Sequence, residues 1–208
     1  MKILIADDHQ LVRMALHCIL NEAYSNAEVE EAADTAEMLK KALKEHWDLI
    51  ISDIAFPDQS GLDALKQIKT HKPKIPVLML SMYPAQEYAI RCITAGAVGY
   101  LNKENIADEL IKAINQILAG KKYINMEVAE ILAASFEDKS RTVLHENLSD
   151  REYEVFKLLL EGLSMQEISE KLCISVNTVR THKVHILKKM HLQSDADMIK
   201  YGIQNQLI

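Results

Sequence analysis

The first 120 residues alternate short, continuously apolar runs with amphipathic stretches, and this alternation constrains the fold most. The runs "KILIAD" (2–7), "DLIISD" (48–53) and "PVLMLS" (76–81) are too continuously apolar for strands that face water on one side. We expect two further strands at "AEVEEA" (27–32) and "AVGYLN" (97–102). Amphipathic segments of helical period separate these runs. The pattern predicts a doubly wound, five-stranded parallel sheet with helices on both faces.

The pattern changes after residue 120. A helix is expected over residues 126–135, and the charged, aperiodic stretch "FEDKSRTVLHEN" (136–147) is interpreted as an interdomain linker. Serines at helix-capping positions then predict four helices without any strand; these are Ser149, Ser164, Ser175 and Ser194. The expected organisation is a first domain over 1–120, a helix and linker over 121–145, and a small all-helical domain over 146–208.

Charge differs between the two parts. The whole chain carries a net charge of −6, while residues 149–208 hold equal numbers of basic and acidic side chains. The acidic excess therefore lies entirely before residue 149, which indicates two parts with different partners.

Composition also bears on the compartment. The three cysteines are far apart and lack metal-ligand spacing, so reduced thiols in the cores are expected. The apolar run at the N-terminus is too short for a signal peptide, and no run reaches the roughly 18 residues of a membrane span. The prediction is a soluble cytoplasmic protein without membrane association.

Chemically reactive side chains fall where the expected strands end. Asp7 and Asp8 end the first apolar run, Asp53 the third and Ser81 the fourth, while the fifth leads through Tyr100 to Lys103. Because the carboxyl ends of parallel strands meet at one edge, three carboxylates, a hydroxyl and an ammonium should converge there.

Three carboxylates at one edge repel one another unless cations lie among them. An all-oxygen ligand set suits Mg²⁺, and Lys103 supplies a second positive charge. A carboxylate beside these cations is suited to attack phosphorus and form an acyl phosphate. Asp53 is the candidate nucleophile, although each of these acids taken singly is better explained as a solvated strand-end residue.

The segments "ILIADDH", "DLIISDIAFPDQSGLD", "VLMLSMY" and "GAVGYLNKE" resemble the receiver domain of two-component response regulators over residues 1–120. The resemblance implies a flavodoxin-like fold in which Asp53 is the phosphoacceptor. It also implies that Asp8, Asp53 and the Ala55 carbonyl bind Mg²⁺, with Asp7 acting mostly through water.

By the same resemblance, Lys103 contacts the phosphoryl group. Ser81 and Tyr100 are then the pair that reorients when phosphate arrives and remodels the surface around the fifth strand. The phosphoryl donor implied is a sensor histidine kinase.

In the C-terminal part, "LSMQEISEKLCISVNTVRTHKVHILKKM" (163–190) has the spacing of a helix-turn-helix, whose second helix can enter the major groove of DNA. Between Val176 and His191 the second helix has no acidic residue. We expect base-edge contacts from Arg180, Thr181 and Val184. Contacts to the phosphate backbone of DNA are expected from Asn177, Thr178, Lys183, Lys188 and Lys189. The alternative is the solvated face of an ordinary helical bundle.

Residues 146–206 resemble the LuxR-type DNA-binding domain of the NarL/FixJ class of response regulators. That family commonly has a Ser-Arg-x-Glu-Ala pattern after the recognition helix, where this chain has Ser194, Asp195, Ala196 and Asp197. A phosphate or interdomain contact is therefore expected to be missing, which would make DNA binding weaker or more dependent on dimerisation.

The leading hypothesis is a transcription factor switched by phosphorylation at Asp53, which binds promoter DNA as a homodimer when phosphorylated. One alternative is an enzyme, an aspartyl-phosphate phosphatase or phosphotransferase. It is disfavoured because such enzymes usually carry an aspartate two residues after the nucleophile, where Ala55 stands. Another alternative is a pseudo-receiver that binds DNA without phosphorylation.

Overall fold

The computed structural model describes residues 1–57, 59–137, 144–205 and 207–208. The chain divides into two compact units, residues 1–139 and residues 140–208, and each is described by itself. Within the described ranges, no helix is both long enough and apolar enough to cross a membrane.

The first unit contains a five-stranded sheet in the order β2-β1-β3-β4-β5, and every neighbouring pair is parallel. Its strands are β1 (Lys2–Ala6), β2 (Glu28–Ala32), β3 (Leu49–Asp53), β4 (Val77–Ser81) and β5 (Gly99–Asn102). Four helices connect the strands, α1 (Gln10–Ala23), α2 (Thr35–Lys44), α3 (Gly61–His71) and α4 (Ala85–Thr94), and α5 (Ile106–Leu118) follows β5. The predicted doubly wound parallel sheet is confirmed.

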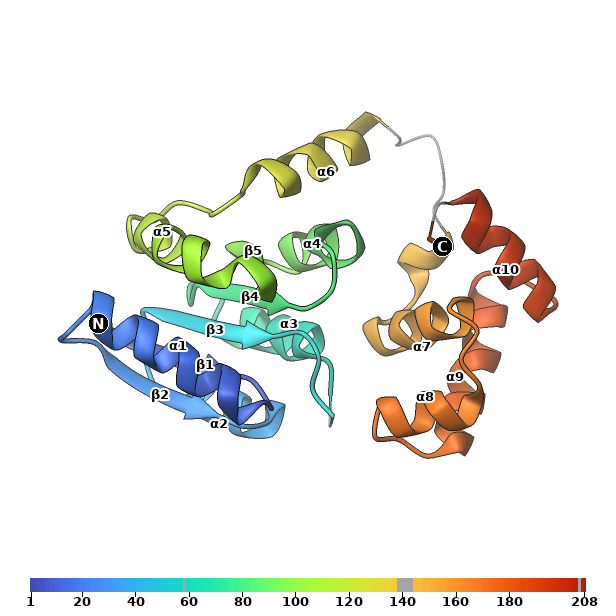
Figure 1. Cartoon of the computed structure of the whole chain (residues 1–208), viewed down its shortest axis with the longest axis horizontal. Helices are drawn as coiled ribbons and strands as arrows, with labels where there is room; N and C mark the ends of the chain where they lie inside the picture. The colour runs from blue at the N-terminus through green and yellow to red at the C-terminus, as the bar shows by residue number, and fades with distance from the viewer. Residues whose placement is uncertain (58, 138–143, 206) are drawn as a thin grey trace. The chain divides into compact units, whose positions relative to one another are not determined.

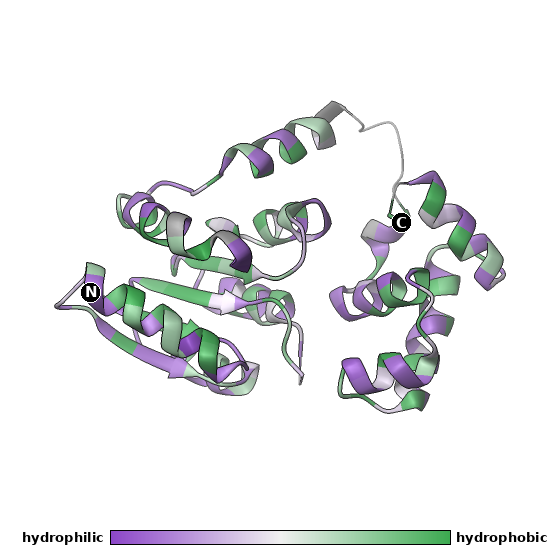
Figure 2. Cartoon of the chain, viewed as in Figure 1, coloured by the Kyte–Doolittle hydropathy of each residue, from purple (hydrophilic) through white to green (hydrophobic). Residues whose placement is uncertain are grey.

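Helices cover both faces of the sheet (Figure 1). On one face, side chains from β1, β3, β4 and β5 pack against Leu16 and Leu20 of α1 and against Leu110 and Ile114 of α5. Strands β3 and β4 are buried at every position, as their continuous apolar runs predict. The edge strand β2 is only half-buried and is coloured largely hydrophilic in Figure 2.

Helix α2 begins with two hydrogen bonds between its first turn and the residues before it. The Asp34 side chain accepts a hydrogen bond from the Glu37 N–H. The reciprocal bond goes one residue further back, because Glu37 Oε2 accepts from the Ala33 N–H at 3.0 Å.

The chain beyond α5 stays attached to the same unit. Tyr123 forms a parallel bridge with Gly99 of β5, and its N–H donates to the Val98 carbonyl at 2.7 Å. Helix α6 (Met126–Glu137) then packs against α4, where Gln86 donates to Glu127 at 3.1 Å. The helix expected over 126–135 is thus present and two residues longer. Residues 138–143 of the expected linker lie outside the described residues, and its last four residues form the short 3₁₀ helix η2 (Leu144–Asn147).

The second unit is all-helical. Its helices are α7 (Asp150–Leu160), α8 (Met165–Lys171), α9 (Val176–Lys189) and α10 (Asp195–Gln204). Each helix is capped, as predicted, by a serine whose hydroxyl oxygen accepts a backbone hydrogen bond: Ser149, Ser164, Ser175 and Ser194. Two of these caps are full capping boxes, Ser149 with Glu152 and Ser164 with Glu167. Helices α8 and α9 pack together across a tight turn in which Cys173 has a φ of 52°. The all-helical prediction with a helix-turn-helix is confirmed.

The prediction that the cysteines are reduced thiols in the cores is wrong for two of the three. All three are free thiols, but only Cys92 is buried, whereas Cys18 and Cys173 are exposed. Cys18 lies on the outer side of α1, and Cys173 occupies the turn before α9, so neither belongs to a core.

Candidate functional site

The side chains expected to converge do so because four adjacent strands end at the same rim. Asp7 and Asp8 directly follow β1, Asp53 ends β3 and Ser81 ends β4. Lys103 directly follows β5 and begins the 3₁₀ turn η1 (Lys103–Asn105), which leads into α5. The parallel register therefore places these residues next to one another.

Lys103 joins two of the carboxylates. Its Nζ lies 2.6 Å from Asp7 Oδ2 and 2.6 Å from Asp53 Oδ2. All three side chains are buried, with exposed fractions of 7% for Lys103, 0% for Asp7 and 4% for Asp53. Burial of one cation between two anions leaves a net negative charge, which further cations would offset.

The titration of the pair reflects this balance. Burial raises the pKa of Asp53 to about 6, the Lys103 ammonium opposes that shift, and the Asp7 carboxylate adds to it. Burial disfavours the charged form of Lys103, but Asp53 and Asp7 outweigh that effect, so the pKa of Lys103 is raised and the ammonium form persists. The ionised form of Asp53 is therefore destabilised by its surroundings, and a second cation nearby would stabilise it.

The backbone around Asp53 fixes its orientation. Its Oδ1 accepts a hydrogen bond from the Ile54 N–H at 2.7 Å. Gly61 approaches so closely that a Cβ placed there would lie 2.0 Å from the Asp53 carbonyl oxygen. The Gly61 N–H also donates to the Ile54 carbonyl at 2.7 Å. The start of α3 therefore holds the end of β3 in place, and only glycine fits this contact.

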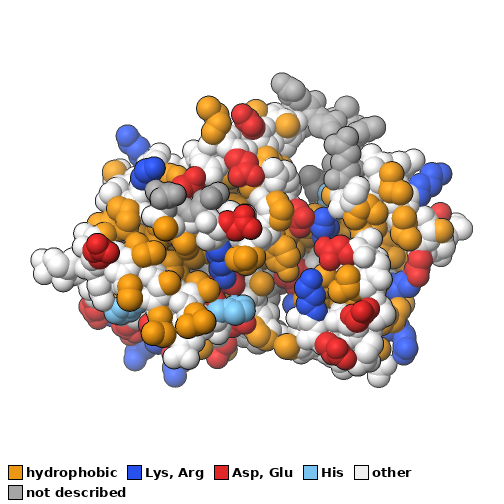
Figure 3. Space-filling model, in the orientation of Figure 1, with side chains coloured by type: hydrophobic (Ala, Val, Ile, Leu, Met, Phe, Trp, Pro, Cys, Tyr) orange, Lys and Arg blue, Asp and Glu red, His pale blue; other side chains and the backbone are white. Residues whose placement is uncertain are grey.

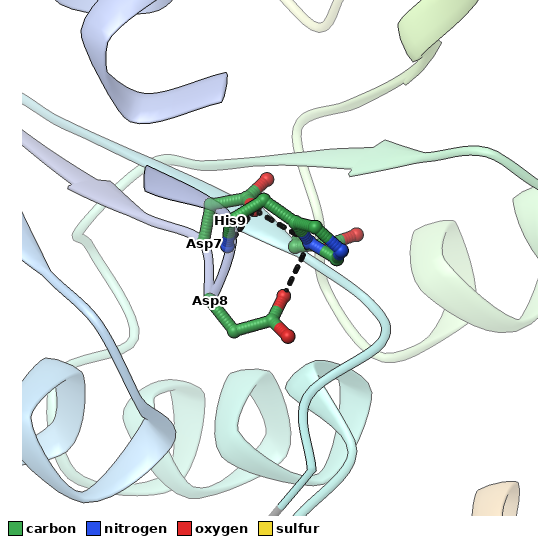
Figure 4. A group of neighbouring side chains, drawn as sticks. Asp7, Asp8 and His9 are labelled. Atoms are coloured by element: carbon green, nitrogen blue, oxygen red, sulfur yellow. Dashed lines mark hydrogen bonds and ion pairs between the residues drawn. The ribbon is translucent and has the colours of Figure 1, made fainter. Parts of the chain in front are cut away.

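Asp8 provides the ligand geometry for a cation. One ligand atom from each of Asp7, Asp8, His9 and Asp53 can be chosen so that all lie within 4.8 Å of one another. Asp8 Oδ1 lies 2.7 Å from His9 Nδ1 (Figure 4), a contact that is an ion pair when the imidazole is protonated. This buried oxygen has no hydrogen-bond partner among the described residues. A carboxylate oxygen that accepts no hydrogen bond, beside two other carboxylates, fits a hard metal cation.

The two expected switch residues lie on neighbouring strands. Ser81 is fully buried, and its Oγ accepts from the Tyr83 N–H at 2.9 Å. Tyr100 is 1% exposed, and its hydroxyl donates to the Tyr83 carbonyl at 2.6 Å. Burial raises the pKa of Tyr100, with the Ser81 hydroxyl acting in the opposite direction. Both side chains therefore hold the loop between β4 and α4, and the Tyr83 ring stacks on Tyr88 of α4 at 5.1 Å.

In the helical unit, α9 separates into a buried and an exposed face. Val179, Ile186 and Met190 are buried in the domain core. Seven of the eight candidate DNA contacts are exposed: Asn177, Thr178, Arg180, Thr181, Val184, Lys188 and Lys189. The eighth, Lys183, has only 17% of its side chain exposed, because its aliphatic stem is covered while the ammonium reaches Asp195.

With this geometry established, comparison with known proteins identifies the family. Residues 3–115 match the description "Response regulator receiver domain", and residues 146–201 match "Bacterial regulatory proteins, luxR family". The chain is 34% identical over its whole length to the oxygen regulatory protein NreC of Staphylococcus epidermidis, of which it covers 99%.

The chain belongs to the response regulators. It joins a receiver domain to a LuxR-type DNA-binding domain, and this family consists of transcriptional regulators, not enzymes.

Solved structures resemble the chain over nearly its whole length. The regulator is similar to RcsB from Salmonella enterica serovar Typhimurium bound to the promoter P1flhDC with the phosphomimetic BeF₃⁻; the TM-score is 0.61, with 26% identity over 97% of each chain. It is also similar to RcsB in a structure of two dimers bound to two parallel DNAs, with a TM-score of 0.59 and 26% identity over 97% of each chain.

The regulator's site includes residues that sequence reasoning did not single out. Arg13 donates to the Asp7 carbonyl at 2.6 Å and to Glu31 at 2.9 Å, which fixes the end of β1. Gly61 carried a weak signal, since a glycine at the start of a helix often marks a close approach. The sequence marked Asp195 as a departure from the family pattern, but its pairing with Lys183 and that of Glu152 with Lys189 could not be read from it, because only the folded domain brings these acids to α9.

Proposed function

We propose that the regulator is a phosphorylation-controlled, DNA-binding transcription factor of a two-component system. The observation that carries the proposal is the buried group of Asp7, Asp53 and Lys103, with Nζ 2.6 Å from both carboxylates, beside an Asp8 oxygen that has no hydrogen-bond partner among the described residues. This is a nucleophilic carboxylate with a fixed cation and the ligands for a second one.

The proposed metal is Mg²⁺. Asp8, Asp53 and the Ala55 carbonyl would hold it directly, and Asp7 mostly through water. When bound, the ion supplies positive charge that offsets the carboxylates and polarises a phosphoryl group. Oxygen ligands fit Mg²⁺ better than softer metals, whereas the nearby His9 imidazole is not a preferred ligand of Mg²⁺.

The proposed reaction transfers a phosphoryl group from a histidine of a sensor kinase. An Asp53 carboxylate oxygen forms a bond to phosphorus, the phosphorus–nitrogen bond breaks, and the electron pair and a proton return to the histidine ring. Both Asp53 oxygens are already engaged, Oδ1 by the Ile54 N–H and Oδ2 by Lys103. The Lys103 contact is the exchangeable one, since a phosphoryl oxygen can take the place of the carboxylate oxygen at Nζ.

The proposed readout runs through Ser81 and Tyr100. A phosphoryl group on Asp53 offers new acceptor oxygens that compete for the Ser81 hydroxyl. Any movement of Ser81 alters its bond to Tyr83, whose carbonyl also accepts from Tyr100. The loop before α4 and the packing of α4 would change together.

The proposed output is promoter binding by a homodimer. Arg180, Thr181 and Val184 would read base edges, because all three are exposed on α9. Asn177, Thr178, Lys183, Lys188 and Lys189 would contact the phosphate backbone. The RcsB structures on DNA support this assignment by similarity.

We also propose the domain limits 1–120, 121–145 and 146–208, and a cytoplasmic location remains a prediction.

The proposal is tested by measuring promoter affinity with and without acetyl phosphate and Mg²⁺. The DNA is obtained by selection from random sequence with the phosphorylated protein. We expect tighter binding after phosphorylation for wild type and for Asp63→Ala, a partly exposed aspartate of α3 that serves as the matched control. Asp53→Ala should show no gain. An equal gain in Asp53→Ala would refute the switching role of Asp53, and equal binding in all conditions would favour the pseudo-receiver alternative.

A further inference from the structure

Two of the four lysine and arginine side chains on the recognition helix α9 are held by acids of their own domain. Lys183 Nζ lies 2.6 Å from Asp195 Oδ2, and Lys189 Nζ lies 2.6 Å from Glu152 Oε2. For Arg180 and Lys188 no ion pair is found within the described part of the chain. Half of this positive charge on the helix is therefore already compensated before DNA arrives.

The two acids, Glu152 and Asp195, differ in how much they contribute to the structure of the domain. Glu152 is 5% exposed and forms the capping box of α7, accepting from the Ser149 N–H at 2.8 Å. Burial opposes ionisation of Glu152, but hydrogen bonds from Lys189 and from the Ser149 cap outweigh it, so the pKa of Glu152 is lowered. Glu152 is thus part of the fold, and its pairing with Lys189 is a by-product of that role.

Asp195 has no comparable structural role. Helix α10 is capped by Ser194, and the reciprocal contacts come from Asp197, whose Oδ2 accepts from Ser194 Oγ at 2.8 Å and from the Gln193 N–H at 3.2 Å. The Asp195 side chain is 61% exposed, and its one described side-chain partner is Lys183.

The position of this pair matters for DNA. Arg180, one turn before Lys183, is exposed, whereas the Lys183 side chain is only 17% exposed, so the Lys183–Asp195 pair lies at the border of the exposed face of α9. Asp195 brings a carboxylate to that border, where a DNA phosphate would repel it. Figure 3 shows acidic and basic side chains interspersed over the visible face of the helical unit, without a single-sign field.

We propose that Asp195 lowers the affinity of the regulator for DNA by holding Lys183 in an intradomain ion pair. The inference rests on the DNA-binding function proposed above. Exposed ion pairs are weak, so a phosphate can displace Asp195, but the exchange makes each phosphate contact of Lys183 less favourable. A single domain then binds DNA weakly, and stable occupancy depends on two domains bound side by side.

The test uses the full chain and duplex DNA of random sequence, because phosphate contacts do not depend on sequence. Asp195→Asn should tighten binding by roughly 3- to 10-fold at low salt, and should steepen the dependence of log affinity on log salt by about 0.9 for one added contact. Glu161→Gln removes the same charge from the exposed C-terminal end of α7 and should change affinity less than about 2-fold.

A second substitution separates the ion pair from simple repulsion. Lys183→Ala should weaken binding by less than about 2-fold in the wild type, since Lys183 is already paired, but should remove the gain of Asp195→Asn in the double variant. Asp195→Ser, which keeps a good helix-start residue, should reproduce the gain, and circular dichroism checks that each variant is folded.

Absence of a gain in both folded Asp195 variants would overturn the inference. A gain that persists in full without Lys183 would also overturn it, because Asp195 would then act on DNA directly. These results differ from failure of the proposed function, in which neither wild type nor Asp195→Asn binds duplex DNA at low salt.

Discussion

The two units use ion pairs in opposite ways. At the rim of the receiver sheet, Lys103 is buried between two carboxylates that are at most 4% exposed. On the recognition helix, Lys183 meets an Asp195 carboxylate that is 61% exposed. The distances are the same, 2.6 Å in each pair, but the surroundings differ.

Burial decides what such a pair can do. In a poorly solvated site a charge cannot be left without a partner, so Lys103 keeps its carboxylates until a phosphoryl oxygen takes the place of one of them at Nζ. At the surface, water and salt replace a lost partner cheaply, so an acid there can be exchanged for a DNA phosphate. The buried group at the rim is suited to phosphoryl chemistry, and the exposed pair on α9 is suited to adjusting the affinity for DNA.

The largest expected effect comes from removing the buried cation. Lys103→Ala leaves Asp7 and Asp53 uncompensated and should lower the free energy of unfolding by about 3–4 kcal/mol at pH 8 without metal. Urea denaturation measures the change, and added Mg²⁺ should recover part of it. The exposed Lys66, 3.4 Å from Asp63, is the control, and Lys66→Ala should cost less than about 1 kcal/mol. Equal losses for the two variants would break the comparison.

The next largest effect is expected from disturbing the close contact between Gly61 and the backbone of Asp53. Gly61→Ala places a methyl group against the Asp53 carbonyl oxygen and should cost about 2–3 kcal/mol, because backbone must move to relieve the overlap. The variant should also accept phosphate more slowly from acetyl phosphate. Gly120→Ala, with φ +77° and open space around its Cβ, should cost about 1 kcal/mol and leave phosphorylation unchanged. A phosphorylation rate unchanged in Gly61→Ala would show that α3 does not position Asp53.

The pKa of Asp53 predicts a pH-dependent effect of neutralising it. Because its pKa in the folded protein is about 6, above the ordinary 3.8, the folded chain binds a proton that the unfolded chain loses between these values. The contribution of Asp53 to stability therefore falls as pH rises from about 4 to about 6 and stays low above that. Asp53→Asn should stabilise the metal-free protein by about 2 kcal/mol at pH 8 and have no effect near pH 4. Thermal unfolding at both pH values measures this, and a destabilised Asn variant at pH 8 would contradict it.

The smallest effect is expected at the exposed pair. Lys183→Ala should change the free energy of unfolding by less than about 1 kcal/mol, and less still in high salt. Chemical denaturation of the wild type and of Lys183→Ala at two salt concentrations provides the measurement. A loss as large as that for Lys103→Ala would mean that surface pairs and buried pairs of this protein do not differ.

Much of the fold and of the candidate site could be predicted, because strand ends and helix caps are encoded by residues close together in the sequence. Strand ends fix where Asp7, Asp53, Ser81 and Lys103 lie once the sheet is parallel, and serine caps fix the helix starts of the second unit. What could not be predicted depends on contacts distant in sequence, such as Lys189 with Glu152, which are 37 residues apart. The burial of Tyr100 against the Tyr83 carbonyl and the attachment of Tyr123 to β5 likewise arise only from folding.

The most direct test of the central claim locates the phosphoryl group chemically. The protein is incubated with acetyl phosphate and Mg²⁺, the acyl phosphate is reduced with borohydride, and the modified residue is identified by peptide mass spectrometry. The account predicts conversion of aspartate to homoserine at position 53 alone, and none when Mg²⁺ is withheld. Modification at Asp7 or Asp8, or a yield at Asp53 that does not depend on Mg²⁺, would contradict it.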